Sequence, residues 1–403
     1  MKDKITDIHQ SPFRMVLAIT GGGTEAIGEL LRHGRGSDTL LEAIVPYSKE
    51  SLHELIGKKP DSYVSAETAK DMAMSAYRRA LLLDSRTEKA EPLNLIGIGV
   101  TCKLAKQGDE REGRQHEVYF ASQSYHKTTV SGVSFEKKGS REEQESITAN
   151  FILNRIASLC KPEKYAKDAN LEDNTKDRTL IIDKETEADG ETSKLLLNTL
   201  ESINSGKNSP QKVNLGKNSN KPCIIMSGSF NPCHKNHIEM AMIASEKYGM
   251  PVDFEISLAN VDKPPIDYIS LKERVDSVRV CIQDMGKGSA GNIYLSNSPL
   301  FADKAILFPD SVFIIGTDTL NRLFNVNYYR EGEDMQSLID HFRKYNIRFL
   351  VFRRKDAQIC IEIDIPDICD IVSYDCYNDD GTSSTKIRNE RNAVSNNSTG
   401  IVY

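Results

Sequence analysis

The stretch Gly228-Ser229-Phe230-Asn231-Pro232-Cys233-His234-Lys235-Asn236-His237 decides the fold of the second half of the chain. The apolar run 223–226 before it predicts a buried strand, and 238–244 after it has the composition and apolar spacing of a helix. A strand therefore leads through a Gly/Pro turn into a helix that carries two histidines near its start.

His234 and His237 are three residues apart, so on a helix they share one face and can converge on one group. The first turn of such a helix offers unpaired N–H groups and the positive end of the helix dipole, which suit a phosphate. Imidazoles held there can donate hydrogen bonds to an oxyanion as its charge develops. Such a histidine pair could instead bind zinc, together with Cys233 or Cys223. Zinc sites need further ligands at suitable spacing, and none is evident in the sequence. The pattern favours phosphoryl chemistry.

The same stretch resembles the G-x-F-x-P-x-H-x-x-H signature of the nucleotidyltransferase superfamily, and most of all its nicotinamide mononucleotide adenylyltransferases. Many relatives carry glycine where this chain has Asn236, a helical position that accommodates asparagine. The residues that match are Gly228, Phe230, Pro232, His234 and His237.

Length and composition limit the class of protein. A chain of 403 residues exceeds one ordinary core, so two domains are expected, and 39% hydrophobic with 27% charged residues is typical of a soluble globular protein. A net charge of −6 without a basic stripe argues against a general nucleic-acid binder, and no apolar run approaches the ~20 residues that cross a bilayer. The start lacks an apolar signal segment, and eight cysteines without a C-x-x-C pair fit reduced thiols. We expect a cytoplasmic or nuclear protein that binds neither nucleic acid nor membrane.

Residues 1–165 are predicted to form an α/β domain with a largely parallel sheet, because apolar strands alternate with helices along the sequence. The segment Gly21-x-Gly23-x-x-Ala26 roughly fits a dinucleotide-binding fingerprint. That fit is weak, since no acidic residue is suitably placed at the end of a second strand and a tight strand-to-helix turn needs glycine anyway. The expected strands are 13–19, 43–48, 94–100 and 116–121, and helices are expected to start near 24, 49 and 65 and to span 141–158.

This domain resembles the CinA-type nicotinamide mononucleotide deamidase domain in the order and spacing of its motifs. The nucleophile-type serine of that family falls on Ala18, and its lysine falls on Leu52. Amide hydrolysis needs an activated nucleophile with a base in reach, and these two residues supply neither. The resemblance therefore implies a retained fold without deamidase activity, serving as a ligand-sensing module or as the site of homo-oligomerisation. The matching segments are Leu17–Gly22, Tyr47–Leu52, Val64–Glu67 and Gly99–Lys103.

Residues 166–220 are rich in Lys, Asp, Glu, Asn and Ser and are predicted to be a polar linker with a short docking helix over 193–203. Residues 221–403 are predicted to form the second domain, a Rossmann-like parallel sheet. Ligands of such sheets bind beyond the carboxyl ends of the strands. Asn260 and Lys263 follow one strand of this domain and are expected to meet the acceptor substrate.

Two further strand ends resemble the adenylyltransferase pattern. Gly316 and Asp318 match a Gly-x-Asp that contacts nucleotide in relatives, and Phe352-Arg353 matches a strand-ending apolar-Arg pair. Near the carboxy terminus, Thr382-Ser383-Ser384-Thr385-Lys386-Ile387-Arg388 places three hydroxyls at a helix start with an arginine one turn on. Hydroxyls, N–H groups and a planar guanidinium together suit phosphate oxygens. The stretch resembles the family's Ile-Ser-Ser-Thr-x-x-Arg motif, with Thr382 in place of isoleucine.

The two motifs together imply nucleotidyl transfer, in which an acceptor phosphate attacks the α-phosphorus of a nucleoside triphosphate in line and expels pyrophosphate. Such a reaction needs positioning and charge stabilisation more than covalent help. His234, His237 and Arg388 are the expected catalytic residues, and Mg²⁺ is expected to enter with ATP, bound to phosphate oxygens and water. The residues expected to bind the nucleotide are Gly228, Ser229, Phe230, Gly316, Asp318, Arg353, Ser383, Ser384 and Thr385.

The resemblance implies ATP and nicotinamide mononucleotide as substrates and a role in NAD biosynthesis. The chain has no tryptophan to stack on the nicotinamide ring, so Phe324, Tyr328 or Tyr329 is the expected replacement. A cytidylyltransferase acting on another phosphorylated acceptor is the alternative within the class. A non-catalytic protein in which both domains bind nucleotide for regulation is the alternative outside it.

Overall fold

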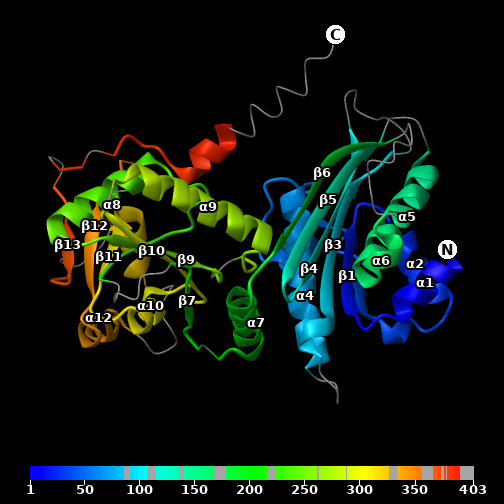
Figure 1. The fold of residues 1–403 in the computed structure, drawn as a ribbon. Helices are drawn as coiled ribbons and strands as arrows, with labels where there is room; N and C mark the ends of the chain where they lie inside the picture. Colours follow the sequence, from blue (N-terminus) through cyan, green and yellow to red (C-terminus); the bar gives the residue numbers. More distant parts are fainter. Residues whose placement is uncertain are drawn as a thin grey trace, which may run out of the picture. The chain divides into compact units, whose positions relative to one another are not determined.

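The chain divides into two compact units (Figure 1). The amino-terminal unit comprises Met1–Asn208 with Val261–Ile269, and the carboxy-terminal unit comprises Ser209–Asn260 with Ser270–Tyr403. The computed structural model describes residues 1–85, 91–106, 115–135, 140–167, 178–207, 209–216, 223–260, 263–286, 288–325, 334–355, 366–373, 376–377 and 379–390.

The amino-terminal unit contains a six-stranded sheet in the order β2-β1-β3-β4-β5-β6. Strand β1 runs parallel to β2 and β3, whereas the other neighbours are antiparallel. The expectation of a largely parallel sheet is therefore wrong for this unit, because the connection Tyr125–His126 between β4 and β5 is far too short for a crossover. The strands are β1 (Arg14–Thr20), β2 (Leu40–Ile44), β3 (Leu95–Lys103), β4 (His116–Ser124), β5 (Lys127–Phe135) and β6 (Arg178–Glu187).

Helix α4 packs directly on β3, where two glycines allow the backbones to meet. A Cβ atom at Gly97 would lie 2.1 Å from the backbone nitrogen of Tyr77, and one at Gly99 would lie 2.3 Å from the carbonyl oxygen of Ala69. Ser65 caps the start of α4, which agrees with the helix start expected near residue 65. The helices of this unit are α1 (Lys2–His9), α2 (Glu25–Arg32), α3 (Lys49–Ile56), α4 (Ala66–Asp84), α5 (Arg141–Cys160), α6 (Pro162–Tyr165) and α7 (Gly190–Ser205).

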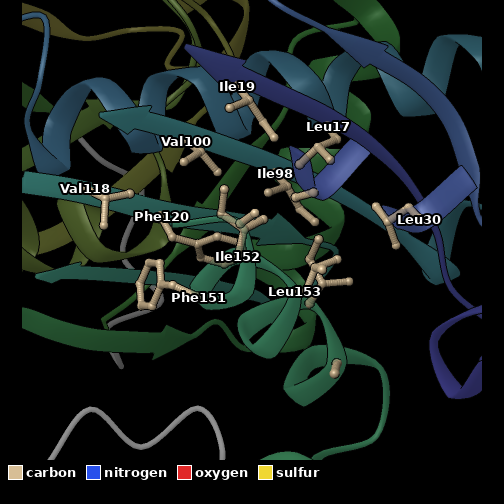
Figure 2. Close-up of a cluster of buried hydrophobic side chains, with 14 of the residues drawn as sticks. Leu17, Ile19, Leu30, Ile98, Val100, Val118, Phe120, Phe151, Ile152 and Leu153 are labelled. Atoms are coloured by element: carbon tan, nitrogen blue, oxygen red, sulfur yellow. The ribbon is translucent and has the colours of Figure 1, made fainter. Parts of the chain in front are cut away.

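Helix α5 contributes to the main hydrophobic core of the amino-terminal unit, shown in Figure 2. Its Phe151 packs edge to face on Phe120 of β4, with ring centroids 6.4 Å apart. Truncating such a buried phenylalanine to alanine costs about 3–5 kcal/mol, so this layer is a major source of stability. The other labelled residues of this core are Leu17, Ile19, Leu30, Ile98, Val100, Val118, Ile152 and Leu153.

The range 166–220, predicted as a polar linker, is folded in most of its described part. Strand β6 is the outermost strand of the amino-terminal sheet, and α7 follows it, so both belong to the amino-terminal unit. The prediction was wrong because most side chains of β6 are exposed, which gives this edge strand a polar sequence. The expected docking helix over 193–203 corresponds to the larger part of α7.

The segment 261–269 also belongs to the amino-terminal unit, although it lies in the second half of the sequence. Tyr268 is 2% exposed, its backbone N–H donates to Thr128 Oγ1 at 3.0 Å, and its hydroxyl donates to the carbonyl oxygen of Tyr125 at 2.5 Å. These bonds hold the segment to both ends of the turn that joins β4 and β5.

The carboxy-terminal unit contains a seven-stranded sheet in the order β13-β12-β11-β8-β9-β10-β7. All neighbours are parallel except β7 and β10, which confirms the α/β class and the parallel sheet expected here. From β8 the chain continues to β9 on one side and later to β11 on the other, so a topological switch point lies at β8. The strands are β7 (Lys212–Asn214), β8 (Ile224–Ser227), β9 (Val252–Ser257), β10 (Ala290–Ser296), β11 (Val312–Gly316), β12 (Arg348–Phe352) and β13 (Cys369–Ile371).

The helices of this unit alternate with its strands, as a parallel sheet requires. One core cluster packs Phe313 of β11 and Phe349 of β12 against Phe342 of α12. No helix within the described ranges is both long and apolar enough to cross a bilayer. The helices are α8 (Lys235–Tyr248), α9 (Tyr268–Asp284), α10 (Phe301–Leu307), α11 (Thr317–Leu323) and α12 (Met335–Lys344).

Candidate active site

The loop that leaves β8 is built around the ring of Phe230. Phe230 is 1% exposed and has a left-handed backbone with φ of 43°, and its ring centroid lies 5.6 Å from that of Phe254 and 5.2 Å from that of His237. A Cβ atom on Gly228 would lie 3.0 Å from the edge of the Phe230 ring, so glycine is needed there. Ser229 is exposed, and its carbonyl oxygen accepts a hydrogen bond from Arg274 Nη1 at 3.4 Å. The Phe230 ring therefore packs edge to face against the His237 ring and helps to hold it in place.

The end of β8 is anchored by a buried ion pair beneath this loop. Glu255 is 0% exposed, and Lys304 Nζ donates to its Oε2 atom at 2.7 Å and to Ser227 Oγ at 2.5 Å. Ser296 Oγ donates to the other carboxylate oxygen of Glu255 at 2.5 Å. A buried charged group is tolerated only when its hydrogen bonds are satisfied, and here they are. The cluster holds Ser227, from which the loop departs.

The two histidines lie against each other at the start of α8, with ring centroids 3.8 Å apart. His234 is the residue that precedes the helix, and its backbone N–H donates to Nδ1 of His237 at 3.2 Å. Because that nitrogen accepts, the neutral His237 ring carries its proton on Nε2 and can donate from there. Nδ1 of His234 is buried and has no hydrogen-bond partner among the described residues.

Both imidazoles are neutral at physiological pH. Burial lowers the pKa of His234 to about 4, and the nearby Arg354 guanidinium lowers it further while Asp379 opposes the shift. Burial lowers the pKa of His237 to about 3, with additional contributions from His234 and Arg354. The pair therefore offers N–H donors rather than positive charges, and the fixed charge beside it comes from Arg354.

The carboxy-terminal motif lies against the loop after β8. Arg388 Nη1 donates to the carbonyl oxygen of Asn231 at 2.6 Å, and Ser384 Oγ donates to that of Pro232 at 2.8 Å. Arg388 Nη2 also donates to Thr385 Oγ1 at 3.2 Å, and Ser383 Oγ accepts the backbone N–H of Lys386 at 3.3 Å. Residues 384–390 are helical, so Ser383 acts as the cap. The structure thus brings the two motifs together.

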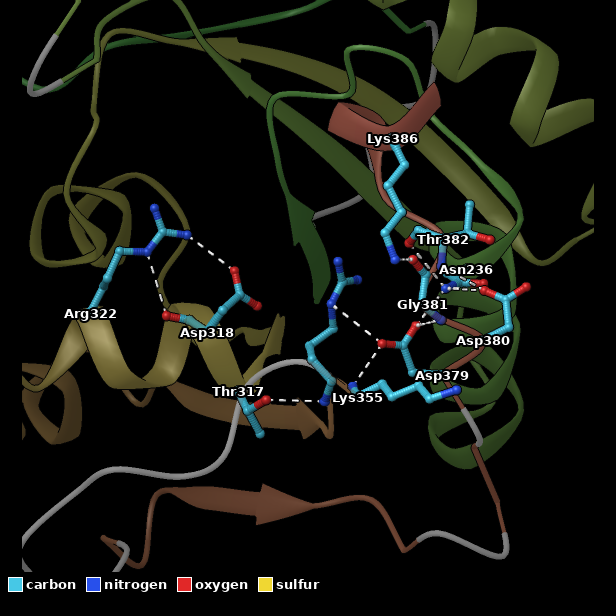
Figure 3. Close-up of polar contacts among 11 residues, drawn as sticks. Asn236, Thr317, Asp318, Arg322, Lys355, Asp379, Asp380, Gly381, Thr382 and Lys386 are labelled. Carbon is cyan, nitrogen blue, oxygen red and sulfur yellow. Dashed lines mark hydrogen bonds and ion pairs between the residues drawn. The ribbon is translucent and has the colours of Figure 1, made fainter. Parts of the chain in front are cut away.

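Gly316, at the end of β11, lies beside Asp318 and Arg354. A Cβ atom there would lie 2.6 Å from Asp318 Oδ1 and 3.1 Å from Arg354 Cγ, so glycine lets these two side chains approach. Asp318 also pairs with Arg322, one turn along α11, at 3.2 Å (Figure 3). The backbone N–H of Arg354 donates to Thr317 Oγ1 at 3.0 Å, which fixes the chain just beyond β12.

Arg354 is a site residue that sequence reasoning missed. The prediction of Arg353 for the nucleotide stays a prediction. The guanidinium that lowers the pKa of both imidazoles, and that lies 4.0 Å from Asp379, is that of the neighbouring Arg354. Strand β12 is buried on both faces from Phe349 to Phe352, as is usual in parallel sheets. No in–out alternation was therefore available to tell the two arginines apart.

The turn 379–382 is the second feature that the sequence did not reveal. Asp379 and Asp380 lie beside Asn236 at the start of α8 (Figure 3). Asp380 also forms an ion pair with Lys235. Lys386 Nζ donates to the carbonyl oxygen of Gly381 at 2.7 Å. Acidic residues in a polar loop look like a solvated surface, and only tertiary contacts reveal the packing of Asp379.

Of the residues predicted to meet the acceptor, Asn260, Lys263 and Phe324 lie within the described ranges. Asn260 is exposed in the carboxy-terminal unit, whereas Lys263 falls in the segment grouped with the amino-terminal unit. Phe324 is 9% exposed and packs in the core of its unit, so its ring is committed to protein contacts. Tyr328 and Tyr329 lie outside the described residues.

The donors around the histidine pair suit an anion. They are imidazole N–H groups, the Arg354 and Arg388 guanidinium groups and serine and threonine hydroxyls. The described residues contain no group of three or more His, Cys, Asp or Glu side chains that would hold a metal ion. A magnesium ion that accompanied a nucleotide would be coordinated by phosphate oxygens and water rather than by these side chains.

In the amino-terminal unit, the Glu145 carboxylate accepts hydrogen bonds from the residues that follow the glycine turn 21–23. Glu145 Oε1 accepts from Thr24 Oγ1 at 3.1 Å and from the backbone N–H of Glu25 at 3.4 Å, at the start of α2. A carboxylate in that position takes the place that a bound anion would occupy. Ala18 and Leu52, the positions that align with the serine and lysine of the deamidase family, are 0% and 3% exposed and so are buried apolar residues.

Two comparisons with known proteins bear on the family to which the chain is similar. Residues 225–390 match the family model described as cytidylyltransferase-like, so the carboxy-terminal unit contains a cytidylyltransferase-like domain. A curated relative from Schizosaccharomyces pombe, named "Putative nicotinamide mononucleotide adenylyltransferase", is 27% identical over 151 residues. The match covers 36% of this chain and 59% of that relative, so the chain spans about three fifths of the relative's length.

Solved structures of competence-damaged protein (CinA) superfamily members are similar to the amino-terminal part of the chain. One from Enterobacter cloacae is 18% identical, with 40% of this chain and 89% of that chain covered and a TM-score of 0.31. One from Klebsiella pneumoniae is 14% identical, with 41% and 98% covered and a TM-score of 0.30. A competence/damage inducible protein from Agrobacterium tumefaciens is 18% identical, with 39% and 94% covered and a TM-score of 0.31.

Proposed function

We propose that the carboxy-terminal unit is a nucleotidyltransferase that transfers a nucleoside monophosphate from a nucleoside triphosphate to a phosphorylated acceptor and releases pyrophosphate. One observation carries the proposal: the hydrogen bonds from Ser384 and Arg388 to the loop that precedes the paired histidines. Hydroxyls and a guanidinium suited to the β- and γ-phosphates thereby lie next to imidazoles suited to the α-phosphate.

The side chains have distinct roles in this proposal. His237 donates from Nε2 to an oxygen of the α-phosphate, and the adjacent His234 imidazole contributes a second N–H donor to the same ligand. Arg354 and Arg388 provide fixed positive charge for the triphosphate. Mg²⁺ bound to the nucleotide adds further charge neutralisation. Since all these groups are held before the reaction, catalysis rests on positioning and charge stabilisation.

We further propose ATP and nicotinamide mononucleotide as the substrates, which would make NAD the product. The likeness to the Schizosaccharomyces pombe relative supports this choice, because its printed name is that of a nicotinamide mononucleotide adenylyltransferase. The description of the matching family model favours a second candidate, a cytidylyltransferase that uses CTP and another phosphorylated acceptor.

The amino-terminal unit is proposed to be inactive as a deamidase. The buried Ala18 and Leu52 provide neither nucleophile nor base, and Glu145 occupies the donors at the start of α2. Ammonia release from nicotinamide mononucleotide by the full chain, above that of a buffer control, would contradict this assignment.

The test of the main proposal is a substrate panel. The full-length protein is incubated with Mg²⁺ and either ATP or CTP, together with nicotinamide mononucleotide and other phosphorylated acceptors in turn. Pyrophosphate is measured for every pair, and NAD is measured for the first. Pyrophosphate release that depends on one acceptor is the expected result. Its absence with every pair would reject nucleotidyl transfer, and release with CTP alone would select the second candidate.

A further inference from the structure

Asn236 joins the start of α8 to the segment that leads into the carboxy-terminal motif. Its side chain is buried, with 2% exposed, and Nδ2 donates to Asp379 Oδ1 at 2.7 Å and to Asp380 Oδ1 at 3.0 Å. The carbonyl oxygen of Thr382 lies 3.4 Å from the same nitrogen. Figure 3 shows this amide pointing into the turn 379–382. One side chain on the histidine helix therefore reaches the turn that immediately precedes the hydroxyl and arginine motif.

Asp379 extends this connection to the end of β12. Its Oδ1 atom also accepts the backbone N–H of Gly381 at 3.2 Å, and Oδ2 accepts the backbone N–H of Lys355 at 2.9 Å. Arg354 Nε lies 4.0 Å from the same Oδ2 atom. The carboxylate is 8% exposed, so loss of a donor would leave a buried charge poorly satisfied. Asp379 thus ties together three segments, which follow β8, β12 and β13.

We propose that Asn236 and Asp379 are positioning residues that hold Arg354 and the segment 379–388 against the histidine helix before a nucleotide binds. The proposal rests on the proposed nucleotidyltransferase function and deepens it. Neither residue needs to touch the substrate, because both act through the two arginines. Ordering a segment in advance removes part of the entropic cost of binding, so the expected benefit is in affinity for the triphosphate.

The first experiment measures nucleotide affinity by calorimetry with MgATP and no acceptor, for wild type, Asn236→Ala, Asp379→Asn and the double variant. Each single variant is expected to weaken ATP binding about tenfold, which equals 1.4 kcal/mol. The double variant should lose less affinity than the sum of the two single losses, because both substitutions weaken the one contact that the two side chains share. In steady-state assays the KM for ATP should rise more than kcat falls. Losses that simply add, or an unchanged affinity, would overturn the proposal.

Asn297→Ala is the matched control. Asn297 is equally an asparagine buried in the carboxy-terminal unit, with 5% exposed, and its Nδ2 donates to the carbonyl oxygen of Ser209 at 2.8 Å beside β7 and β10. This variant loses a buried amide hydrogen bond without touching the turn 379–382. It should therefore lose stability and keep the wild-type affinity for ATP.

The second experiment uses no nucleotide and so separates this inference from the proposed function. Backbone hydrogen exchange is measured by mass spectrometry in wild type, Asn236→Ala and Asn297→Ala. Faster exchange in 379–390 is expected only in Asn236→Ala. Unchanged exchange there would reject the positioning role whether or not the protein binds ATP. Absence of ATP binding by the wild type would instead reject the proposed function, and the exchange data would still decide whether Asn236 ties the two segments.

Discussion

Arg388 donates a 2.6 Å hydrogen bond from its guanidinium to the carbonyl oxygen of Asn231, across 157 positions of sequence. Asn231 lies in the loop that leads from β8 to the paired histidines, so this bond joins the two halves of the candidate site. The same guanidinium donates to Thr385 Oγ1, which uses the planar shape of arginine to meet two acceptors at once.

Arg388→Lys should therefore weaken ATP use even though it keeps the charge. A lysine ammonium lacks the fixed fork and does not reproduce both bonds in one geometry. We expect the KM for ATP to rise about tenfold, the scale of one charge-assisted hydrogen bond. Steady-state kinetics at saturating acceptor measure this. Arg343→Lys, on the exposed surface of α12, is the control that should keep the wild-type KM.

His237→Ala should slow turnover by at least ~10², the scale for the loss of one oxyanion donor. The fold should persist, because the supporting contact between Phe230 and Phe254 does not involve the imidazole. Pyrophosphate release at saturating substrates measures kcat, and a thermal melt checks the fold. His341→Ala is the control, since His341 is bonded to the carbonyl oxygen of Ala302 on a different part of the unit. A His237→Ala variant with the wild-type rate would remove this residue from the mechanism.

The two histidines should titrate well below the usual range. With pKa values of about 4 for His234 and about 3 for His237, neither gains a proton between pH 7 and pH 5 in the folded, nucleotide-free protein. The unfolded chain, with ordinary histidine pKa values near 6.5, does gain protons there. These residues therefore stabilise the fold fully above about pH 6.5, and that contribution is lost as the pH falls toward about 4.

Nuclear magnetic resonance of ring-labelled histidine tests this titration. Two resonances assigned by the His234→Asn and His237→Asn variants should keep their neutral shifts down to about pH 5. Bound triphosphate should raise both midpoints, because a nearby negative charge favours the protonated form. Titration midpoints near pH 6.5 for the two histidines without nucleotide would contradict the conclusion that burial and Arg354 lower their pKa values.

The buried pair of Lys304 and Glu255 should be costly to break. Lys304→Met leaves Glu255 charged, buried and without its cation, and breaking such a pair costs about 3–5 kcal/mol. Adding Glu255→Gln should recover part of that loss, since the charge then leaves together with its partner. Urea unfolding of the carboxy-terminal unit in the full chain measures both. Lys272→Met breaks the exposed pair with Asp276 and should cost under about 1 kcal/mol.

Local patterns predicted much of the carboxy-terminal unit. An apolar run followed by a Gly/Pro turn and a histidine-bearing helix defined β8 and α8, and the hydroxyl-rich motif pointed to the segment that contacts them. The sequence did not distinguish Arg354 from Arg353, because β12 is buried on both faces and shows no alternation. The roles of Asn236 and Asp379 depend on contacts across 143 positions, which no local pattern reveals.

In the amino-terminal unit the two errors have different physical causes. Strands β4 and β5 pair antiparallel through the two-residue connection Tyr125–His126, which leaves no room for a helical crossover. The exposed side chains of β6 gave it the composition of a linker, and the sequence pattern of alternating strands and helices had suggested a parallel sheet. By contrast, the start of α4 near residue 65 was predicted correctly, since a helix start depends mainly on neighbouring residues.

Hydrogen exchange during an ATP titration tests most directly whether one triphosphate is bound by both the histidine segment and the carboxy-terminal motif. MgATP is added stepwise to the full-length protein, and exchange is followed in peptides that cover 228–240 and 379–390. Both peptides should become protected with one common midpoint, because one ligand contacts both. Protection of only one peptide, or two clearly different midpoints, would contradict a shared nucleotide site.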